Sequence, residues 1–133
     1  MKILLVSHGD FAQGLCTTMT DFFGATNVYS ACVTAEGGTA DLKAKTDEYL
    51  AEWGEEQVVI CSDLKGGSAN QTMMPYMSRP NTFLISGMNL SLVMQLTMED
   101  EVTTESLHEM MEAAVTDMFL MNEMSFEMSD DDE

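Results

Sequence analysis

Residues 2–10 read Lys-Ile-Leu-Leu-Val-Ser-His-Gly-Asp, and this stretch decides how the rest of the chain is interpreted. The apolar run at 3–6 is typical of a β-strand that is covered on both faces, as in a parallel sheet. His8, Gly9 and Asp10 end the run at once, so the histidine is expected directly after the strand. The run is far too short for a signal peptide or a membrane span, and we expect a cytoplasmic protein.

Strand and helix patterns alternate along the remaining chain. Three further strand-like runs are expected at 28–33, 57–63 and 81–86. Segments with helical spacing of apolar residues are expected at 11–23, 39–53, 68–77, 90–96 and 104–121. The second and third of these helices are predicted to begin at caps formed by Thr39 and Ser68. The order βαβαβαβα implies an α/β fold, with a parallel sheet and helices on both of its faces.

The length of 133 residues suits one domain, which buries roughly two-thirds of the surface that its unfolded chain exposes. We place this α/β domain at 1–121 and a C-terminal extension at 122–133. Within the extension, a short strand is expected at 124–128, and the last five residues, Ser-Asp-Asp-Asp-Glu, form an acidic end.

The charge of the chain limits its partners. Five Lys and Arg residues against 23 Asp and Glu residues give a net charge of −18. Nucleic acids and anionic membranes bind surfaces rich in Lys and Arg, so neither is an expected partner. Proteins with basic docking faces are, because their encounters with an acidic surface are steered electrostatically.

Polar residues and glycines gather at the carboxyl ends of the predicted strands, where parallel α/β sheets place their sites. In chain order they are His8, Gly37, Gly38, Asp63, Gly66, Gly67, Ser68, Asn70, Gly87 and Asn89. If the first and third strands are neighbours in the sheet, His8 and Asp63 lie side by side at this edge.

A histidine beside an aspartate is a nucleophile arrangement. The carboxylate accepts a hydrogen bond from one ring N–H and fixes the tautomer, so the opposite nitrogen keeps an outward lone pair. It also stabilises the positive ring that forms when the outer nitrogen is phosphorylated. The turn Gly66-Gly67-Ser68 offers backbone N–H groups and the positive end of a helix dipole to a phosphate, and its glycines let the backbone come close.

Each feature also has a plainer interpretation. A histidine at a strand end is more often a polar loop residue, and a Gly-Gly-Ser turn is more often only a helix cap. His108, which lies among Glu105, Glu109 and Glu112, is interpreted as a surface residue. The sequence has no P-loop, no G-x-G-x-x-G after the first strand, no G-x-S-x-G and no metal-ligand spacing, so no cofactor or metal is expected. The cysteines are interpreted as small buried apolar residues: Cys16, Cys32 and Cys61.

Three motifs at the strand ends resemble those of a known family. They are V-S-H-G-D at 6–10, S-D-L-K-G-G-S-A-N at 62–70 and S-G-M-N-L-S-L-V at 86–93. In this order they resemble the mannose-type enzyme IIA domains of the bacterial phosphoenolpyruvate-dependent sugar phosphotransferase system, over nearly the whole chain. The expected fold is three-layer α/β/α with a mostly parallel four-stranded sheet in the order 2-1-3-4. The resemblance also implies a homodimer and an added antiparallel C-terminal strand.

The resemblance implies a phosphotransferase that carries phosphate on a histidine. His8 matches the family histidine that accepts a phosphoryl group from the carrier protein HPr and passes it to a histidine of enzyme IIB. Enzyme IIB phosphorylates the sugar as it enters through membrane components, which this chain meets only indirectly. Asp63 matches the aspartate that pairs with that histidine. The family's site loop is matched by Gly66, Gly67 and Ser68, and the rim of the site is expected to include Gly9, Gly37, Lys65, Asn70 and Asn89.

Two alternatives share much of this pattern. The IIA-like subunit of dihydroxyacetone kinases has the same fold and the same strand-one histidine. A non-catalytic regulatory domain, in which His8 only senses phosphorylation, is the other. Lys65 stands where the mannose-type family often has an aromatic or small residue, and Ser91 where it commonly has proline; neither departure removes a reacting group. The D-L-K-G-G-S-A-N and G-M-N-L motifs favour the sugar-transport branch.

Overall fold

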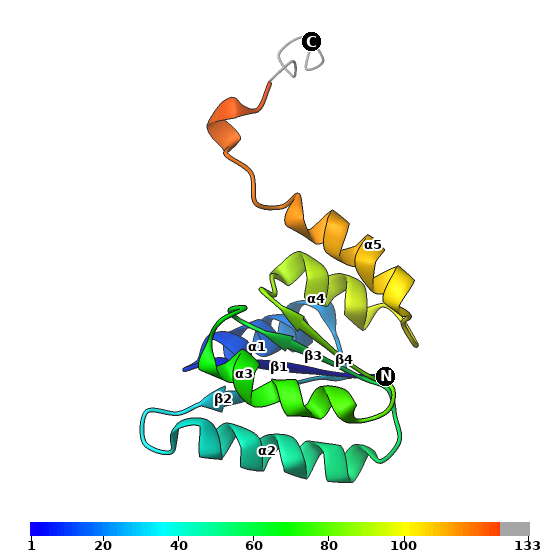
Figure 1. Cartoon of the computed structure of the whole chain (residues 1–133). Helices are drawn as coiled ribbons and strands as arrows, with labels where there is room; N and C mark the ends of the chain where they lie inside the picture. The colour runs from blue at the N-terminus through cyan, green and yellow to red at the C-terminus, as the bar shows by residue number, and fades with distance from the viewer. Residues whose placement is uncertain (126–133) are drawn as a thin grey trace.

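The computed structural model describes residues 1–125 and contains a four-stranded parallel sheet between two layers of helices (Figure 1). Its strands are β1 (Lys2–His8), β2 (Val28–Val33), β3 (Val58–Ser62) and β4 (Thr82–Ser86). They lie in the order β2-β1-β3-β4, and every neighbouring pair is parallel. The predicted three-layer fold and the strand order 2-1-3-4 are therefore confirmed.

Helices cover both faces of the sheet. Within residues 1–125 they are α1 (Phe11–Phe23), α2 (Gly38–Trp53), α3 (Ser68–Met73), α4 (Leu90–Thr97) and α5 (Thr104–Val115), with short 3₁₀ helices η1 (Met74–Ser78) and η2 (Met121–Glu123). One face is covered by α2 and α3, and the other by α1 and α4, with α5 packed on α4 (Figure 1). None of the helices formed by these residues is both long and apolar enough to cross a bilayer.

The central strand β1 carries a continuous apolar run, Ile3–Val6, because it supplies both cores. Ile3 and Leu5 pack into the core beneath α1 and α4, whereas Leu4 and Val6 pack into the core beneath α2 and α3. All four side chains are fully buried. Successive side chains of a strand point to opposite faces, and burial of each large one contributes about 1.5–3 kcal/mol. The continuous apolar run thus fixes β1 in the middle of the molecule, with His8 at its exposed end.

The starts of two helices differ from the prediction. Ser68 does not cap α3 but is its first residue, because Gly67 before it takes the extended conformation of the cap position, with φ −76° and ψ 161°. Thr39 does not cap α2, which begins at Gly38. The predicted helix at 68–77 is α3 followed by η1, and Pro75, which has no N–H, lies at the start of η1.

The end of the last helix also differs. Its buried stripe, Leu107, Met110 and Ala114, matches the predicted spacing. The helix nevertheless ends at Val115 rather than at residue 121, and the segment that follows runs away from the body of the molecule (Figure 1). Met118 is 91 % exposed. The strand expected at 124–128 lies, apart from its first two residues, outside the described residues.

Candidate active site

Because β1 and β3 are neighbours, the residues that end them meet at one edge of the sheet. His8 is the last residue of β1, and Asp63 directly follows β3. Asp63 Oδ2 lies 2.9 Å from Nδ1 of the His8 ring and accepts the backbone N–H of His8, also at 2.9 Å. The backbone N–H of Leu64 donates to Oδ1 at 2.8 Å. The carboxylate is therefore held firmly against one nitrogen of the ring.

The hydrogen bonds around Asp63 decide its charge. Burial raises the pKa of this carboxyl, but the backbone and ring N–H groups of His8, the backbone N–H of Leu64 and the positive charge that His8 can carry outweigh it. The pKa therefore lies below its ordinary value of 3.8, and the group is a carboxylate at neutral pH. A carboxylate only accepts hydrogen bonds, so the proton of the neutral His8 ring lies on Nδ1.

The other ring nitrogen faces Ser68. Nε2 of His8 lies 2.8 Å from Ser68 Oγ. Since Nδ1 carries the ring proton, Nε2 presents a lone pair and the serine hydroxyl donates to it. Ser68 is free for this contact because it is the first residue of α3 and not its cap. The ring is thus held at both nitrogens, by the two ends of the segment at 63–68.

Two glycines allow this close approach. Gly9 has a φ of +55°, the left-handed region that suits glycine, where the chain turns from β1 into α1 directly after His8. A Cβ on Gly67 would lie only 3.3 Å from Cε1 of the His8 ring. Gly66, by contrast, has nothing within 4 Å of the place where a Cβ would stand. Of the two glycines in the Gly-Gly-Ser turn, Gly67 is therefore the one whose Cβ would crowd the His8 ring.

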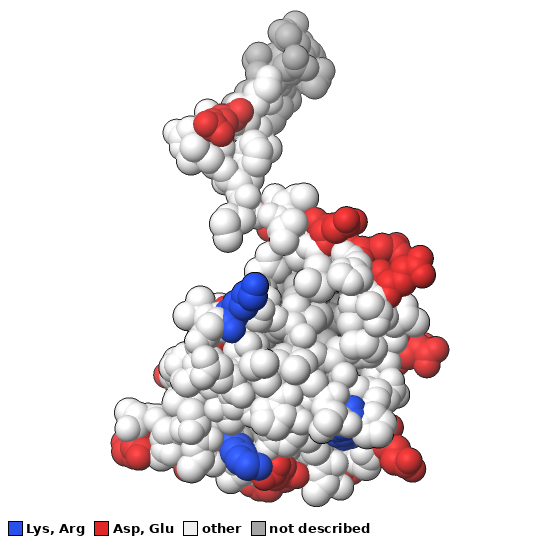
Figure 2. Space-filling model, in the orientation of Figure 1, with Lys and Arg blue, Asp and Glu red and all other residues white. Residues whose placement is uncertain are grey.

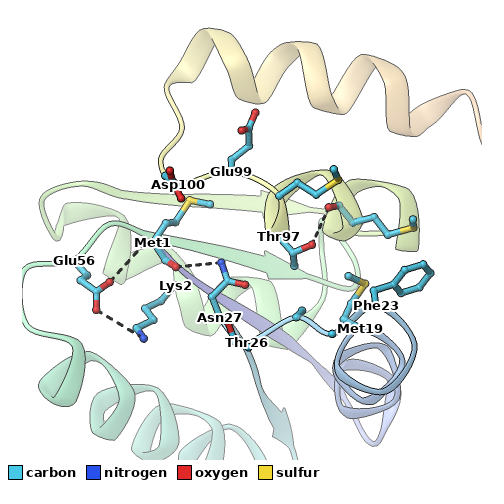
Figure 3. Close-up of a pocket in the computed structure, with 14 residues that line it drawn as sticks. Met1, Lys2, Met19, Phe23, Thr26, Asn27, Glu56, Thr97, Glu99 and Asp100 are labelled. Carbon is cyan, nitrogen blue, oxygen red and sulfur yellow. Dashed lines mark hydrogen bonds and ion pairs between the residues drawn. The ribbon is translucent and has the colours of Figure 1, made fainter.

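The site is a surface rather than a cavity. The His8 side chain is 48 % exposed, whereas that of Asp63 is 12 % exposed behind it. Neither residue lines any of five pockets that residues 1–125 form. A pocket of about 640 Å³ opens instead at the amino ends of the strands, where Glu56 pairs with the N-terminal amine at 3.6 Å and with Lys2 at 3.9 Å (Figure 3).

Two of the expected rim residues follow the outer strands and do structural work. A Cβ on Gly37 would overlap the Asp41 carboxylate, which would then have to leave its hydrogen bond with Thr34 at the start of α2. Asn89 caps α4, and its side-chain amide donates to the carbonyl of Ala114 at 2.8 Å, which joins α4 to α5. Neither makes a hydrogen bond to His8 within the described part of the chain.

Two further expected rim residues, Lys65 and Asn70, lie in the turn before α3 and within α3 itself. Lys65 is exposed, and within residues 1–125 its side chain forms no hydrogen bond or ion pair. Asn70 is 8 % exposed, and its side chain bonds to the Lys65 carbonyl and to Ser62. Asn70 therefore lies beneath the loop and not on the rim.

Two serines that the sequence analysis passed over help to shape the site. Ser7 Oγ accepts the backbone N–H of Ala12 at 2.7 Å, which fastens the turn that follows His8. Ser62 Oγ donates to Asn70 Oδ1 at 2.7 Å. Both serines are fully buried at the ends of apolar strands. A buried hydroxyl needs a hydrogen-bond partner. The signal in the sequence was therefore a serine at the end of an apolar strand.

Charge and metal ligands complete the picture. In the view of Figure 2, acidic side chains gather on the outer side of α5 and cationic ones are few and scattered. His108 lies exposed on that helix. Within residues 1–125, no group of three or more His, Cys, Asp or Glu residues is arranged to hold a metal ion.

Comparison with known proteins finds a matching family model and solved structures of similar fold. A family model described as EIIA-man, PTS system fructose IIA component, matches residues 2–115. A search of curated proteins returns no match.

Solved structures of similar fold cover most of the chain. The mannose/sorbose specific IIA subunit of the phosphotransferase system from Enterococcus faecalis is 22 % identical, with a TM-score of 0.80, and the match covers 94 % of this chain and 97 % of that one. The PTS IIA protein associated with the fucose utilization operon from Streptococcus pneumoniae is 23 % identical, with a TM-score of 0.79 and coverage of 91 % and 93 %. The phosphotransferase system component EIIA from Streptococcus agalactiae is 19 % identical, with a TM-score of 0.72 and coverage of 90 % and 95 %.

Proposed function

Because the chain belongs to the EIIA-man family of phosphotransferase-system IIA components, we propose that it is a phosphocarrier that uses His8. It accepts a phosphoryl group from phospho-HPr on Nε2 of His8 and passes it to a histidine of an enzyme IIB partner. One observation carries the assignment to Nε2: the ionised Asp63 lies 2.9 Å from Nδ1 and holds the ring proton there. The lone pair on Nε2 is then the nucleophile.

The transfer runs between two imidazoles. The P–N bond of the donor phosphohistidine breaks, and its electron pair returns to the donor ring, while the Nε2 lone pair forms the new P–N bond. The His8 ring becomes positively charged, with its proton still on Nδ1. Asp63, already in place as a carboxylate, stabilises that charge without rearrangement, which is where preorganised electrostatics contribute most.

Ser68 changes partner during the step. Its hydroxyl donates to Nε2 in the free protein and has to release the lone pair before phosphate binds. Rotation about χ1 then lets the same hydroxyl donate to a phosphoryl oxygen. The first N–H groups of α3, which begins at Ser68, have no acceptor inside the helix and are free to bond to phosphoryl oxygens. The helix dipole contributes less than the sequence suggested, since α3 has only six residues.

The open, shallow site suits a protein donor and a protein acceptor. His8 is 48 % exposed, and two apolar side chains beside the site, Phe11 and Leu64, are 55 % and 61 % exposed. A docked partner would bury these side chains and exclude water from the transferring phosphoryl group. The net charge of −18 favours partners with basic docking faces.

The experiment that tests the proposal is reconstitution. The purified chain is incubated with phosphoenolpyruvate, enzyme I and HPr, and the modified residue is mapped by mass spectrometry under alkaline conditions. We expect one phosphoryl group, labile to acid and stable to alkali, on His8. A chain that takes no phosphate from phospho-HPr, or takes it on another residue, would overturn the assignment.

We further propose that the chain forms a homodimer. The end of α5 and the segment that follows it expose a row of large apolar side chains: Val115, Met118, Phe119, Leu120, Met121 and Met124. Such a row, together with the exposed edge of strand β4, favours self-association. Light scattering at micromolar concentration should give twice the 14.7 kDa mass of the chain, and a monomer mass would refute the proposal.

A further inference from the structure

The two residues that contact the nitrogens of the His8 ring lie at the two ends of the loop at 63–67. Asp63 begins the loop and lies 2.9 Å from Nδ1, and Ser68, directly after it, lies 2.8 Å from Nε2. The residues at 64–66 between these ends are exposed. Burial of their own side chains therefore does not fix the path of the loop, and some other interaction has to.

A buried asparagine ties the middle of this loop to the sheet. Asn70 Nδ2 donates to the carbonyl of Lys65 at 2.9 Å, and Asn70 Oδ1 accepts the hydroxyl of Ser62 at 2.7 Å. Asn70 is 8 % exposed and Ser62 is fully buried. Loss of either partner would leave a buried polar group unpaired, which costs more than the bond itself contributes. This bridge therefore resists displacement of the loop.

The anchor of the bridge is rigid. The carbonyl of Ser62 accepts the backbone N–H groups of Gly87 and Met88, each at 3.0 Å. Ser62 also lies opposite Val6 in the β1–β3 pairing, two residues before His8. Asn70 thus fixes the position of the loop relative to the strand pair that carries the histidine.

We propose that Asn70 is a positioning residue for phosphoryl transfer at His8. It holds the loop at 63–67 so that Asp63 and Ser68 contact the two nitrogens of one ring at the same time. No hydrogen bond joins Asn70 to His8 among the described residues, so its influence passes through the loop. The kinetic part of this inference rests on the proposed function, whereas the geometric part concerns the unphosphorylated protein alone.

Three variants separate the two hydrogen bonds of the bridge. Asn70→Ala removes both of them. Asn70→Asp keeps the acceptor for Ser62 but places an oxygen where the donor to the Lys65 carbonyl stood, and Ser62→Ala removes only the other bond. The matched control is Gln57→Ala, at the opposite end of β3, where a side-chain amide joins the chain to the backbone of Val102 at 2.7 and 2.9 Å.

The first measurement is the tautomer of the neutral His8 ring, from its ¹⁵N shifts in the unphosphorylated protein. Wild type and Gln57→Ala should carry the proton on Nδ1. All three bridge variants should show a larger share of the Nε2–H form than wild type. The second is the transfer rate at saturating phospho-HPr, which should fall about tenfold or more in Asn70→Ala, since small misplacements of reacting groups cost large factors. The apparent KM for phospho-HPr should stay within about twofold.

The two readouts distinguish the possible failures. Bridge variants that fold and keep the wild-type tautomer and rate would overturn the role of Asn70, and so would equal losses in Gln57→Ala. If Asn70→Ala does not fold, Ser62→Ala and Asn70→Asp carry the same test. A wild-type protein that takes no phosphate would overturn the proposed function, while the tautomer measurement would still decide whether Asn70 positions the loop.

Discussion

The loops that follow the two inner strands and those that follow the two outer strands reach the same edge of the sheet but do different work. After β1 and β3, the side chains of His8 and Asp63 bond to each other at 2.9 Å. After β2 and β4, Gly37 and Asn89 serve the starts of the helices that follow them. A place at the carboxyl end of a strand is therefore not enough to put a residue in the site.

The difference follows from the direction of the connections. From β1 the chain leads outward to β2, and from β3 it leads outward to β4, so the order of the strands reverses between β1 and β3. At such a reversal the connections diverge and leave a crevice, where α/β proteins bind ligands. The outer loops lead directly into α2 and α4, and their polar groups form hydrogen bonds at the starts of those helices.

The strongest test of this contrast between inner and outer loops is to remove His8. His8→Ala should accept no phosphate from phospho-HPr, because no other described residue at the edge pairs a ring nitrogen with a carboxylate. Incorporation is followed by mass spectrometry under alkaline conditions, with circular dichroism as the control for folding. Phosphate that still enters the variant at the wild-type level would move the reaction away from the inner loops.

Replacement of the inner carboxylate should have the next largest effect. Asp63→Asn keeps the size of the side chain but removes the negative charge that stabilises the phosphorylated ring. The expected loss of about 1.4 kcal/mol or more of transition-state stabilisation slows phosphorylation roughly tenfold or more. Rapid-quench transfer from phospho-HPr measures it, with both proteins shown to be folded.

Two results of that experiment would contradict the assignment. Equal rates for wild type and Asp63→Asn would remove Asp63 from the chemistry. An alkali-labile product on the wild type would point to an acyl phosphate, and so to phosphate on a carboxylate instead of His8.

The sequence was sufficient to predict the sheet and the pairing of His8 with Asp63, and particular residues show why. The apolar run before His8 identified a strand covered on both faces, and the alternation of elements made the sheet parallel. With β1 and β3 as neighbours, the meeting of His8 with Asp63 followed. These inferences depend on burial and topology, which a pattern of apolar residues records directly.

The details that the sequence missed depend on backbone angles and on packing at a distance. Ser68 resembled a helix cap, but the extended conformation of Gly67 made glycine the cap and released the serine hydroxyl toward His8. Asn70 resembled a residue on the rim, yet its amide is buried against the Lys65 carbonyl. The stripe of the last helix continued to Met118 in the sequence, but among residues 1–125 that side chain is almost fully exposed.

Ser68→Ala should have a smaller effect than either change to the inner pair. The hydroxyl donates to a neutral nitrogen before transfer and, as proposed, to a charged phosphoryl oxygen during it. A neutral hydrogen bond contributes about 1 kcal/mol and a charge-assisted one about twice that, so the net loss is about 1 kcal/mol, or roughly fivefold in rate. Single-turnover transfer from phospho-HPr measures it, and a faster variant would mean that Ser68 only obstructs Nε2.

The smallest effect on transfer should come from the outer loops, and Asn89→Ala is the test. Asn89 Oδ1 accepts the backbone N–H of Leu92 at 2.9 Å as the cap of α4, and its amide donates to Ala114 at 2.8 Å. Loss of the cap costs about 0.5–2 kcal/mol, and loss of the bond to Ala114 adds about 1 kcal/mol. The free energy of unfolding should therefore fall by about 1.5–3 kcal/mol, as measured by urea denaturation. The transfer rate of the folded variant should stay within about twofold of wild type, because neither bond reaches the His8 ring. A slowing comparable to that of Asp63→Asn would place the loop after β4 in the site, and the contrast between inner and outer loops would then fail.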